Sequence, residues 1–405
     1  MTKYLIIGQG AAGTSAARTL RQIDPLASVT MISAESDWFY SRVDLPDIIA
    51  GKLSPEDAIL AGREQFDALK IECRIGETAR RIDPAGQAVE LSSGARVPYD
   101  KLLLATGSEP VVPPMPGGGA RGVHYLWTLA DTRRILEASR AARSAVVVGA
   151  GLIGLKTALA LKERGLEVAV VEKMLHVMPQ QLDETAAAIL ADKVQGAGIQ
   201  VVTGMQVNAL ETVDGKVTGV LLEQRRIVAD MVVIAVGVRA NVALGRGAGL
   251  EVGRGLVTNE FLETSAPGIY AAGDAAEIRD LLTGAPIVPA TWGVAVEQGK
   301  VAALNMAGKR IAYDGAIGMN SVDIAGIPMI SVGTINPAAD DRQFTVQSGD
   351  TYRKVVVRGK QVNGVLFLGN VRQAGVAANL VLRRAEIGEI DILSSNFSFV
   401  SVMAQ

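Results

Sequence analysis

The feature that most constrains this chain is a glycine pattern that occurs twice, each time after a short apolar run and before a helical segment. The two copies are Gly8-Gln9-Gly10-Ala11-Ala12-Gly13 and Gly149-Ala150-Gly151-Leu152-Ile153-Gly154. In such a turn the first glycine allows the tight bend, the second lets a pyrophosphate approach the backbone, and the third lets helix and strand pack closely. The free amides and dipole of the helix then attract phosphate. One copy is weak, but two in the right context predict two dinucleotide sites.

Each glycine pattern lies inside a predicted β-α-β unit. The runs that carry the strand and helix patterns are Lys3–Ile7, Ala11–Leu20 and Ser28–Ile32 in the first copy, and Ala145–Val148, Leu152–Arg164 and Glu167–Val171 in the second. The copies lie too far apart for a solenoid repeat, which predicts two separate nucleotide-binding domains instead. We therefore expect an α/β fold with two Rossmann-like domains.

Segments rich in proline and glycine divide the chain further. The stretch 109–119 has the composition of a crossover, and a second crossover is expected after Val236-Gly237-Val238-Arg239-Ala240-Asn241. Strand-like runs and one helical run, Ala374–Arg384, then indicate a third, α+β domain. The expected division is a first nucleotide domain in two parts (1–112 and 240–314), a second nucleotide domain (113–239) and a C-terminal interface domain (315–405).

An acidic residue about 20 positions after the glycine pattern is expected to bind the adenine-side ribose. In the second copy Glu172 follows the strand directly, and its charge would repel a 2′-phosphate, which favours NADH over NADPH. Lys173 and His176 are close enough to weaken this preference. In the first copy the strand ends at Ser33-Ala34 and the nearest acid is Glu35. Glu35 fits less well, and the alternative is that it is simply solvated.

Composition excludes several other classes of protein. The formal net charge is −2 and the charges are interspersed, which argues against a nucleic-acid binder. No apolar run reaches the roughly 18 residues of a membrane span, and the run before Gly8 is too short for a signal peptide. The only cysteine is Cys73, and the only histidines, His124 and His176, form no ligand cluster. We expect a cytoplasmic protein with no metal site.

In the order and spacing of its motifs the chain resembles the pyridine-nucleotide flavin oxidoreductases of the rubredoxin and ferredoxin reductase type. More narrowly, it is similar to the flavin module of NADH-dependent nitrite reductases. The resemblance covers essentially the whole chain. Besides the two glycine patterns it rests on Tyr40-Ser41-Arg42-Val43-Asp44-Leu45-Pro46, Ala105-Thr106-Gly107, Ala235-Val236-Gly237 and Gly268-Ile269-Tyr270-Ala271-Ala272-Gly273-Asp274.

The resemblance implies FAD and NAD as cofactors. Residues implied to bind FAD are Gly8, Gly10, Ala11, Ala12, Gly13, Ser33, Ala34, Glu35, Arg42, Ala79, Ala105, Thr106, Gly107, Gly273, Asp274 and Trp292. Residues implied to bind NAD are Gly149, Gly151, Leu152, Ile153, Gly154, Glu172 and Gly237. Asp274 would hold the ribityl chain, because ribityl hydroxyls need a fixed acceptor. Trp292 would lie near the flavin ring, although it is also explained as an ordinary core tryptophan.

The missing cysteines narrow the expected reaction. Disulfide reductases of this superfamily need a cysteine pair, and related oxidases and peroxidases use one cysteine beside the flavin. Here that stretch reads Trp38-Phe39-Tyr40-Ser41-Arg42-Val43, without sulfur. The resemblance then implies hydride transfer from NADH to FAD and electron transfer to a protein carrier, such as ferredoxin, rubredoxin or an iron–sulfur or sirohaem subunit. The alternatives are an NADH oxidase using dioxygen and a flavin-containing sensor or scaffold, and a homodimer remains open.

One departure from the family pattern concerns charge. The family commonly has glutamate two residues after the third glycine of the second pattern, where this chain has Lys156. In ferredoxin-reductase relatives that glutamate pairs with a lysine, and counting along this chain places Asp47 at the lysine position. We therefore hypothesise a reversed pair, Asp47–Lys156, with a catalytic role beside the flavin and nicotinamide. The alternative is that both residues are exposed and unrelated.

Overall fold

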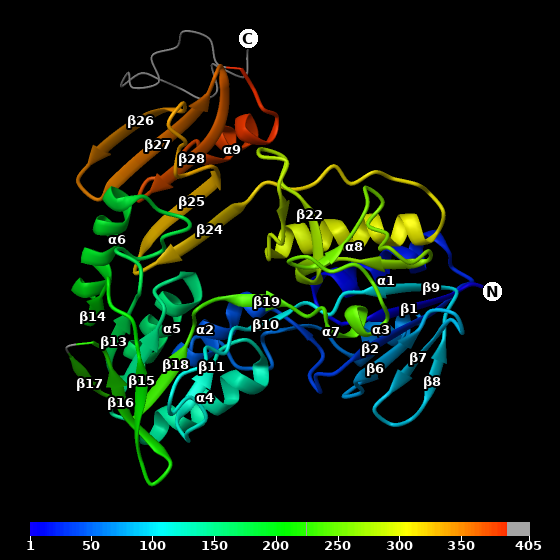
Figure 1. Cartoon of the computed structure of the whole chain (residues 1–405), viewed down its shortest axis with the longest axis horizontal. Coiled ribbons are helices and arrows are strands. Elements are labelled where there is room, and N and C mark those ends of the chain that lie inside the picture. Colours follow the sequence, from blue (N-terminus) through cyan, green and yellow to red (C-terminus); the bar gives the residue numbers. More distant parts are fainter. Residues whose placement is uncertain (224, 387–405) are drawn as a thin grey trace. The chain divides into compact units, whose positions relative to one another are not determined.

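The computed structural model describes residues 1–223 and 225–386, and the chain divides into two compact units (Figure 1). The first unit contains residues 1–43, 54–109 and 238–316, and the second contains 44–53, 110–237 and the chain from 317. The short segment 44–53 therefore belongs to the second unit, although the residues on both sides of it belong to the first. The four-segment division expected from the sequence stays a prediction.

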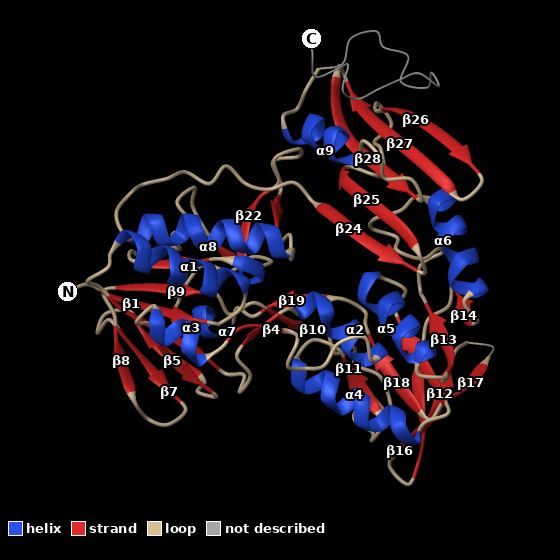
Figure 2. Ribbon diagram, turned by 180° about the vertical axis from the view of Figure 1, so that it is seen from behind, coloured by secondary structure: helices blue, strands red, loops and turns tan. Residues whose placement is uncertain are grey.

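The first unit is built on a five-stranded parallel sheet with the order β21-β9-β1-β2-β5. Its strands are β1 (Lys3–Ile7), β2 (Ser28–Ser33), β5 (Glu72–Ile75), β9 (Lys101–Leu104) and β21 (Ile269–Ala271). The aliphatic runs of β1 and β9 are buried, as expected for a sheet covered on both faces. Helices α1 (Ala11–Ile23) and α8 (Trp292–Met306) lie side by side along this sheet (Figure 2).

Close packing of these two helices depends on a glycine. A Cβ at Gly299 would lie only 2.1 Å from the carbonyl oxygen of Ala12, so no larger residue fits there.

The remaining elements of this unit are β3 (Phe39–Tyr40), η1 (Arg42–Asp44), β4 (Ile59–Ala61), α3 (Arg63–Ala68), β6 (Ala79–Asp83), β7 (Ala88–Leu91), β8 (Arg96–Pro98), β10 (Ser108–Pro110), β19 (Val238–Ala240), α7 (Ala243–Gly247), β20 (Leu256–Val257), η2 (Gly273–Ala275), β22 (Ala276–Arg279) and β23 (Pro286–Ile287). Of these, η1 and β10 run into the second unit.

The second unit repeats the plan with the parallel order β11-β18-β12-β13-β14. Its nucleotide-binding part consists of α2 (Leu45–Ala50), β11 (Val123–Tyr125), α4 (Leu129–Ala141), β12 (Ser144–Val148), α5 (Leu152–Glu163), β13 (Glu167–Val171), α6 (Glu184–Gly196), β14 (Ile199–Val202), β15 (Ala209–Val213), β16 (Lys216–Leu221), β17 (Arg226–Val228) and β18 (Met231–Ile234). The α/β fold with two such units confirms the expected class.

The C-terminal part of the second unit is an antiparallel sheet with the order β24-β25-β28-β27-β26 and one helix. These elements are β24 (Met319–Ile324), β25 (Ile327–Gly333), β26 (Arg342–Ser348), β27 (Thr351–Arg358), β28 (Gln361–Leu368) and α9 (Ala374–Leu382). Helix α9 packs on β28 and β25, which agrees with the predicted α+β character. The predicted helix runs two residues further than the observed one.

A buried polar cluster joins this C-terminal sheet to the N-terminus of α6. Asp183 caps α6 by accepting a hydrogen bond from the Ala186 amide (3.1 Å). Its other oxygen accepts from the Tyr352 hydroxyl (2.6 Å) and from the Lys354 ammonium (2.9 Å). Lys354 is only 4% exposed, so its charge depends on Asp183 for compensation. The cluster fixes β27 against α6 within the second unit.

Candidate functional site

The first glycine loop lies at the carboxyl end of β1, where the three predicted glycine roles can be compared with space in the structure. Gly8 has φ +113°, and a Cβ there would lie 2.0 Å from the Ala105 carbonyl oxygen. A Cβ at Gly13 would lie 1.9 Å from the Gly8 carbonyl oxygen. At Gly10 nothing lies within 4 Å. Gly8 and Gly13 thus serve close packing, while Gly10 leaves open space for a pyrophosphate.

The second glycine loop, at the end of β12, repeats this geometry. Cβ atoms at Gly149 and Gly154 would lie 2.4 Å and 2.0 Å from carbonyl oxygens, and Gly151 again faces open space. The backbone repeats as well, because Gly8 donates to Ile32 (2.8 Å) and Gly149 to Val171 (2.7 Å). Ala11 and Ala12 form the first turn of α1, and Leu152 and Ile153 form that of α5, so each set of amides is placed for an anion.

A cavity opens beside the first glycine loop, and we refer to it as the first-loop cavity. Its lining comes from the loop, the end of β2 and the segment that follows, and consists of Gln9, Gly10, Ser33, Glu35, Asp37, Trp38, Phe39, Tyr40 and Arg42. Four of these residues, Gly10, Ser33, Glu35 and Arg42, belong to the predicted FAD set, whereas the exposed Ala34 is not part of the lining. The cavity lies at the strand end where a dinucleotide ribose is expected.

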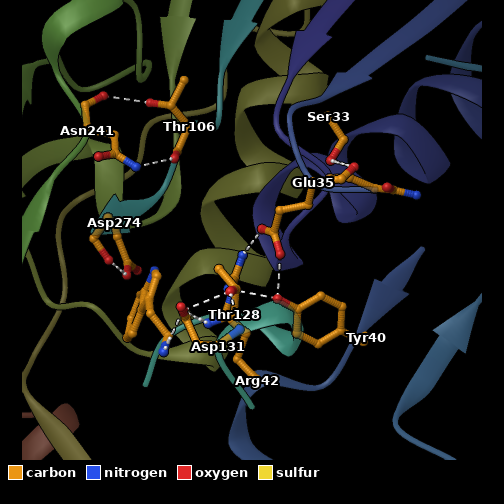
Figure 3. Close-up of polar contacts among 12 residues, drawn as sticks. Ser33, Glu35, Tyr40, Arg42, Thr106, Thr128, Asp131, Asn241 and Asp274 are labelled. Carbon is orange, nitrogen blue, oxygen red and sulfur yellow. Dashed lines mark hydrogen bonds and ion pairs between the residues drawn. The ribbon is translucent and has the colours of Figure 1, made fainter. Parts of the chain in front are cut away.

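Glu35 is not a free, solvated acid in this cavity. Its carboxylate forms an ion pair with Arg42 and accepts a hydrogen bond from the Tyr40 hydroxyl (2.5 Å), as Figure 3 shows. Arg42 also donates to the Tyr40 oxygen (3.0 Å). Burial opposes the charge of Arg42, but Tyr40 and Glu35 outweigh it and raise the pKa of Arg42 above its ordinary value. The guanidinium of Arg42 is therefore held in position at the cavity, with Glu35 balancing its charge, and its N–H groups are donors of the kind that suit a phosphate.

Asp274 is held in place by a residue far away in the sequence. The Ser108 hydroxyl donates to its carboxylate (2.6 Å), and Asp274 lies in η2 directly after Gly273. The Gly273 amide in turn donates to the Gln298 side-chain oxygen (2.7 Å). Gln298 is fully buried, and its Nε2 has no hydrogen-bond partner among the described residues. An anchored carboxylate of this kind suits the predicted role of binding ribityl hydroxyls.

Two segments that flank the predicted crossovers meet within the first unit. Thr106 donates through its hydroxyl to the Asn241 carbonyl oxygen (2.7 Å), and the Asn241 side chain donates back to the Thr106 carbonyl oxygen (3.0 Å; Figure 3). The Asn241 amide also donates to the Gly107 carbonyl oxygen (2.9 Å). Strands β10 and β19 pair beside them, with Gly237 at φ +111° just before β19. The residues just before the first predicted crossover are thus hydrogen-bonded to the residue after which the second is expected.

Trp292 and Ala79 are the remaining predicted FAD contacts. Trp292 begins α8, is half-buried and stacks on Phe39, with ring centroids 5.6 Å apart and 23° between the planes. It also packs on the core of the first unit, so a structural role is present whatever else it binds. Ala79 begins β6 and pairs with Leu91 of β7. Their contact with FAD stays a prediction.

In the second unit Glu172 is fixed by the backbone around the glycine loop. One carboxylate oxygen accepts from the Ala150 amide (2.7 Å) and the other from the Met174 amide (2.8 Å). The carboxylate therefore lies directly against the second glycine loop, where the adenine-side ribose is expected. Lys173 is exposed, and His176 contacts the carbonyl oxygen of its neighbour Val177 (3.0 Å).

The hypothesised pair Asp47–Lys156 is not formed as an ion pair within the described part of the chain. Helices α2 and α5 do pack together, so counting along the sequence brought the correct helices together. However, the Asp47 carboxylate lies 3.9 Å from the Lys52 ammonium, and Lys52 also pairs with Glu163 (2.9 Å). Lys156 is half-buried on α5, two residues after Gly154. Lys52, the next basic residue after Asp47 in the sequence, is thus the positive charge near Asp47, in place of Lys156.

The sequence predicted neither a reactive cysteine nor a metal site, and the structure gives the surroundings of the residues concerned. Burial raises the pKa of the Cys73 thiol to about 12, so a reactive thiolate is not available at neutral pH. Within residues 1–223 and 225–386, no three His, Cys, Asp or Glu side chains are grouped so that they could hold a metal. The same residues contain no helix that is both long and apolar enough to cross a membrane.

Sequence reasoning missed several residues that complete the first site. Tyr40 was noted only as part of a motif, and Gln9, Ser108, Asn241 and Gln298 were not assigned any role. Ser108 directly follows Ala105-Thr106-Gly107, and Gln9 lies inside the glycine pattern, so proximity to a motif was the available signal for these two. Nothing local distinguishes Gln298 from any other helical glutamine, because its role depends on its contact with Gly273.

Comparison with known proteins agrees with this geometry. Residues 2–299 match the sequence profile of the pyridine nucleotide-disulphide oxidoreductases. The chain belongs to this family. It is therefore an oxidoreductase of the kind that uses FAD and NAD(H), as the resemblance implied, and the two cofactors agree with the two dinucleotide sites predicted from the glycine patterns. The open space at Gly10 and the fixed Arg42 fit FAD in the first unit, and Gly151 with Glu172 fits NAD in the second.

Two relatives and one solved structure illustrate the range of this family. The nitrite reductase [NAD(P)H] of Bacillus subtilis (strain 168) is 30% identical over 402 residues, covering 97% of this chain and 48% of that protein. The chain thus spans about half the length of that relative. Subunit epsilon of the NADH-dependent phenylglyoxylate dehydrogenase of Aromatoleum evansii is 30% identical over 391 residues, covering 95% and 93%. The covalent putidaredoxin reductase–putidaredoxin complex is 26% identical, with a TM-score of 0.92 over 100% of this chain and 98% of that one.

Proposed function

We propose that this protein oxidises NADH through FAD and passes the electrons to a separate protein carrier such as ferredoxin, rubredoxin or an iron–sulfur or sirohaem subunit. The observation that carries the proposal is the duplicated glycine loop, with open space at both Gly10 and Gly151. One chain then holds a site for each dinucleotide. Bound FAD would supply the redox chemistry, and the chain's residues bind, orient and tune it.

The relatives support a carrier as acceptor. The relative covered almost completely by this chain is a subunit of a larger NADH-dependent dehydrogenase, and the nitrite reductase carries further sequence beyond the matched half. The putidaredoxin reductase fold was solved joined to its redox partner. Two of these names thus place the protein beside another polypeptide, as a subunit or in a complex, and we extend this arrangement to the present chain.

The thiol chemistry supports the same choice. The family name includes disulphide substrates, but this chain has Cys73 as its only cysteine, and that thiol is half-buried with a raised pKa. A thiol-relay mechanism needs a reactive cysteine. Electron transfer directly from the flavin to the acceptor needs none, which favours a carrier protein over a disulfide or peroxide.

The residue roles follow from the two sites. Arg42, fixed by Glu35 and Tyr40, would bind the FAD phosphates, and Asp274 would hold the ribityl chain. Glu172 would bind the NADH ribose and repel the 2′-phosphate of NADPH. Lys156, two residues after Gly154 of the second glycine loop, would influence flavin reduction by NADH through its positive charge.

Anaerobic reduction tests the proposal. Purified protein reconstituted with FAD should lose its yellow colour on addition of one equivalent of NADH without air. Two equivalents of oxidised ferredoxin or rubredoxin, each accepting one electron, should then restore the absorbance of oxidised flavin within the mixing time. Colourless protein that refuses FAD, or flavin that NADH does not bleach, would contradict the assignment. Rapid NADH consumption in air without a carrier would instead favour an NADH oxidase.

A further inference from the structure

The side chain of Gln9 presents an unexplained polar group inside the first unit. Gln9 is 7% exposed, and neither its Oε1 nor its Nε2 has a hydrogen-bond partner among the described residues. Buried polar groups are paired in the great majority of native structures, because leaving one unpaired forfeits its hydration. Since both atoms are unpaired, exchanging oxygen and nitrogen in the amide would not supply a partner. The amide is therefore placed for a group that the chain itself does not provide.

The position of Gln9 shows where that group must lie. Gln9 stands between Gly8 and Gly10 in the glycine loop and lines the first-loop cavity together with Ser33 and Glu35. The loop is held rigidly, because the Gln9 carbonyl oxygen accepts from the Thr14 hydroxyl (3.2 Å) and the Gly10 carbonyl oxygen from the Thr14 amide (2.9 Å). A partner for Gln9 must consequently enter the cavity between the glycine loop and the end of β2.

The chemistry of an amide selects among the groups of a dinucleotide. Phosphate oxygens only accept hydrogen bonds and would leave Oε1 unpaired, whereas a ribose hydroxyl both donates and accepts. The strand-end acid that normally accepts from the ribose, Glu35, already binds Arg42 and Tyr40 through its two oxygens. We propose that the Gln9 carboxamide binds a hydroxyl of the adenosine ribose of FAD and shares this role with Glu35. The proposal rests on FAD binding to the first unit.

Replacing Gln9 with methionine, which has a similar size and no polar head, tests the contact. Apoprotein of Gln9→Met should bind FAD about tenfold more weakly than wild type, as measured by quenching of flavin fluorescence. Its unfolding temperature without FAD should be unchanged or higher, because an unpaired buried amide has been removed. Gln22→Met, at an exposed position near the end of helix α1, which follows the glycine loop, should change neither value. A Gln9→Met protein that binds FAD as tightly as wild type overturns the proposal.

FAD analogues identify the partner group. Analogues lacking the 2′ or the 3′ hydroxyl of the adenosine ribose can be made from FMN and the corresponding deoxy-ATP. Wild type should bind one of them about tenfold more weakly than FAD, and Gln9→Met should show a smaller difference, because only the contact with Glu35 remains in it. Equal losses in both proteins would place the amide against another part of FAD, such as the adenine edge, and overturn the proposal. If Gln9→Met does not fold, Gln9→Asn replaces it, since its shorter amide should lose the same discrimination.

Failure of this inference can be told apart from failure of the proposed function. Wild-type protein that binds FAD and is reduced by NADH, while Gln9 variants behave as wild type, contradicts only the role of Gln9. Wild-type protein that binds no FAD contradicts both.

Discussion

Ser108 and Asp274, which stand 166 positions apart in the chain, share a hydrogen bond of 2.6 Å. The bond joins the crossover after β9 to η2, the turn that follows β21. Strands β9 and β21 are neighbours in the sheet of the first unit, so the two residues leave the same edge of that sheet. A carboxylate that must accept hydrogen bonds from the ribityl chain is thus oriented before the cofactor arrives, which lowers the ordering cost of binding.

Ser108→Ala tests this orientation. Loss of the hydroxyl leaves Asp274 free to turn away, and we expect FAD affinity to fall about fivefold to tenfold, with little change in apoprotein stability. Titration of apoprotein with FAD, followed by flavin fluorescence, gives the value. Ser93→Ala, at an exposed site in the same unit, is the matched control. Unchanged affinity in Ser108→Ala would show that Asp274 needs no orienting partner.

Glu172→Ser tests nucleotide preference in the second unit. Removing the carboxylate eliminates its repulsion of a 2′-phosphate and its hydrogen bonds to the ribose, so kcat/KM should fall for NADH and rise for NADPH. We expect the NADH/NADPH ratio of kcat/KM to drop by about 30-fold, measured with ferricyanide as acceptor. Glu184→Gln, exposed at the start of α6, should leave the ratio unchanged. A preserved ratio in Glu172→Ser would assign the preference to other residues.

Asp183→Asn tests the buried cluster that joins α6 to β27. Burial works to raise the pKa of Asp183, but hydrogen bonds from Tyr352 and Lys354 outweigh it, so the pKa lies below its ordinary value. A lowered folded-state pKa contributes stability above the unfolded-state pKa, and this contribution is lost as pH falls. At pH 7 the variant leaves Lys354 buried without a counter-charge and should lose about 3 kcal/mol of unfolding free energy. Below about pH 4 the difference from wild type should shrink.

The exposed pair Lys193–Asp350, between α6 and the turn before β27, provides the control for this experiment. Its side chains are 40% and 62% exposed, so Asp350→Asn should cost less than about 1 kcal/mol at any pH. Tyr352 makes the stability of the cluster depend on pH at the alkaline end as well, because burial and Asp183 raise the pKa of its hydroxyl. Stability from this raised pKa is present below the ordinary tyrosine pKa and is lost as pH rises above about 10. Equal effects of the two substitutions would contradict a special role for the buried cluster.

Lys156 and Asp47 allow a test of charge near the second glycine loop. Lys156→Glu should slow anaerobic flavin reduction by NADH about tenfold, because it reverses a charge two residues after Gly154. Since Asp47 lies 3.9 Å from Lys52 and forms no ion pair with Lys156 among the described residues, adding Asp47→Lys should not restore the rate. Stopped-flow absorbance of the flavin gives both rates, with Lys52→Met as the control. Recovery of the rate in the double variant would instead support the Asp47–Lys156 pair inferred from the sequence.

The local features of the fold were predictable because they depend on neighbours in the sequence. Strand β1 has the predicted bounds, and α1 begins at the predicted residue. The three glycine roles at Gly8, Gly10 and Gly13 also follow from the pattern, since a strand, a tight turn and a helix within one short segment leave little choice of geometry. The same reasoning held for the second copy, where β12 is only one residue longer than expected.

The partners of the site residues were not predictable in this way. Glu35 looked like a loosely fitting acid, and only folding showed that Arg42 and Tyr40 occupy its carboxylate. The segment 44–53 lies within the second unit, where Asp47 meets Lys52 instead of Lys156. Such pairings depend on where side chains from separate segments end after packing, and spacing along the chain carries no information about that.

The sequence alone therefore determined the α/β class, the two dinucleotide loops and the absence of a cysteine pair, because each is a property of short segments or of composition. Tertiary structure decided which side chain holds Asp274, what neutralises Glu35 and why Gln9 has an unpaired amide. These are contacts between strand ends and helices that only the folded sheets bring together, and their energies depend on burial that no local pattern records.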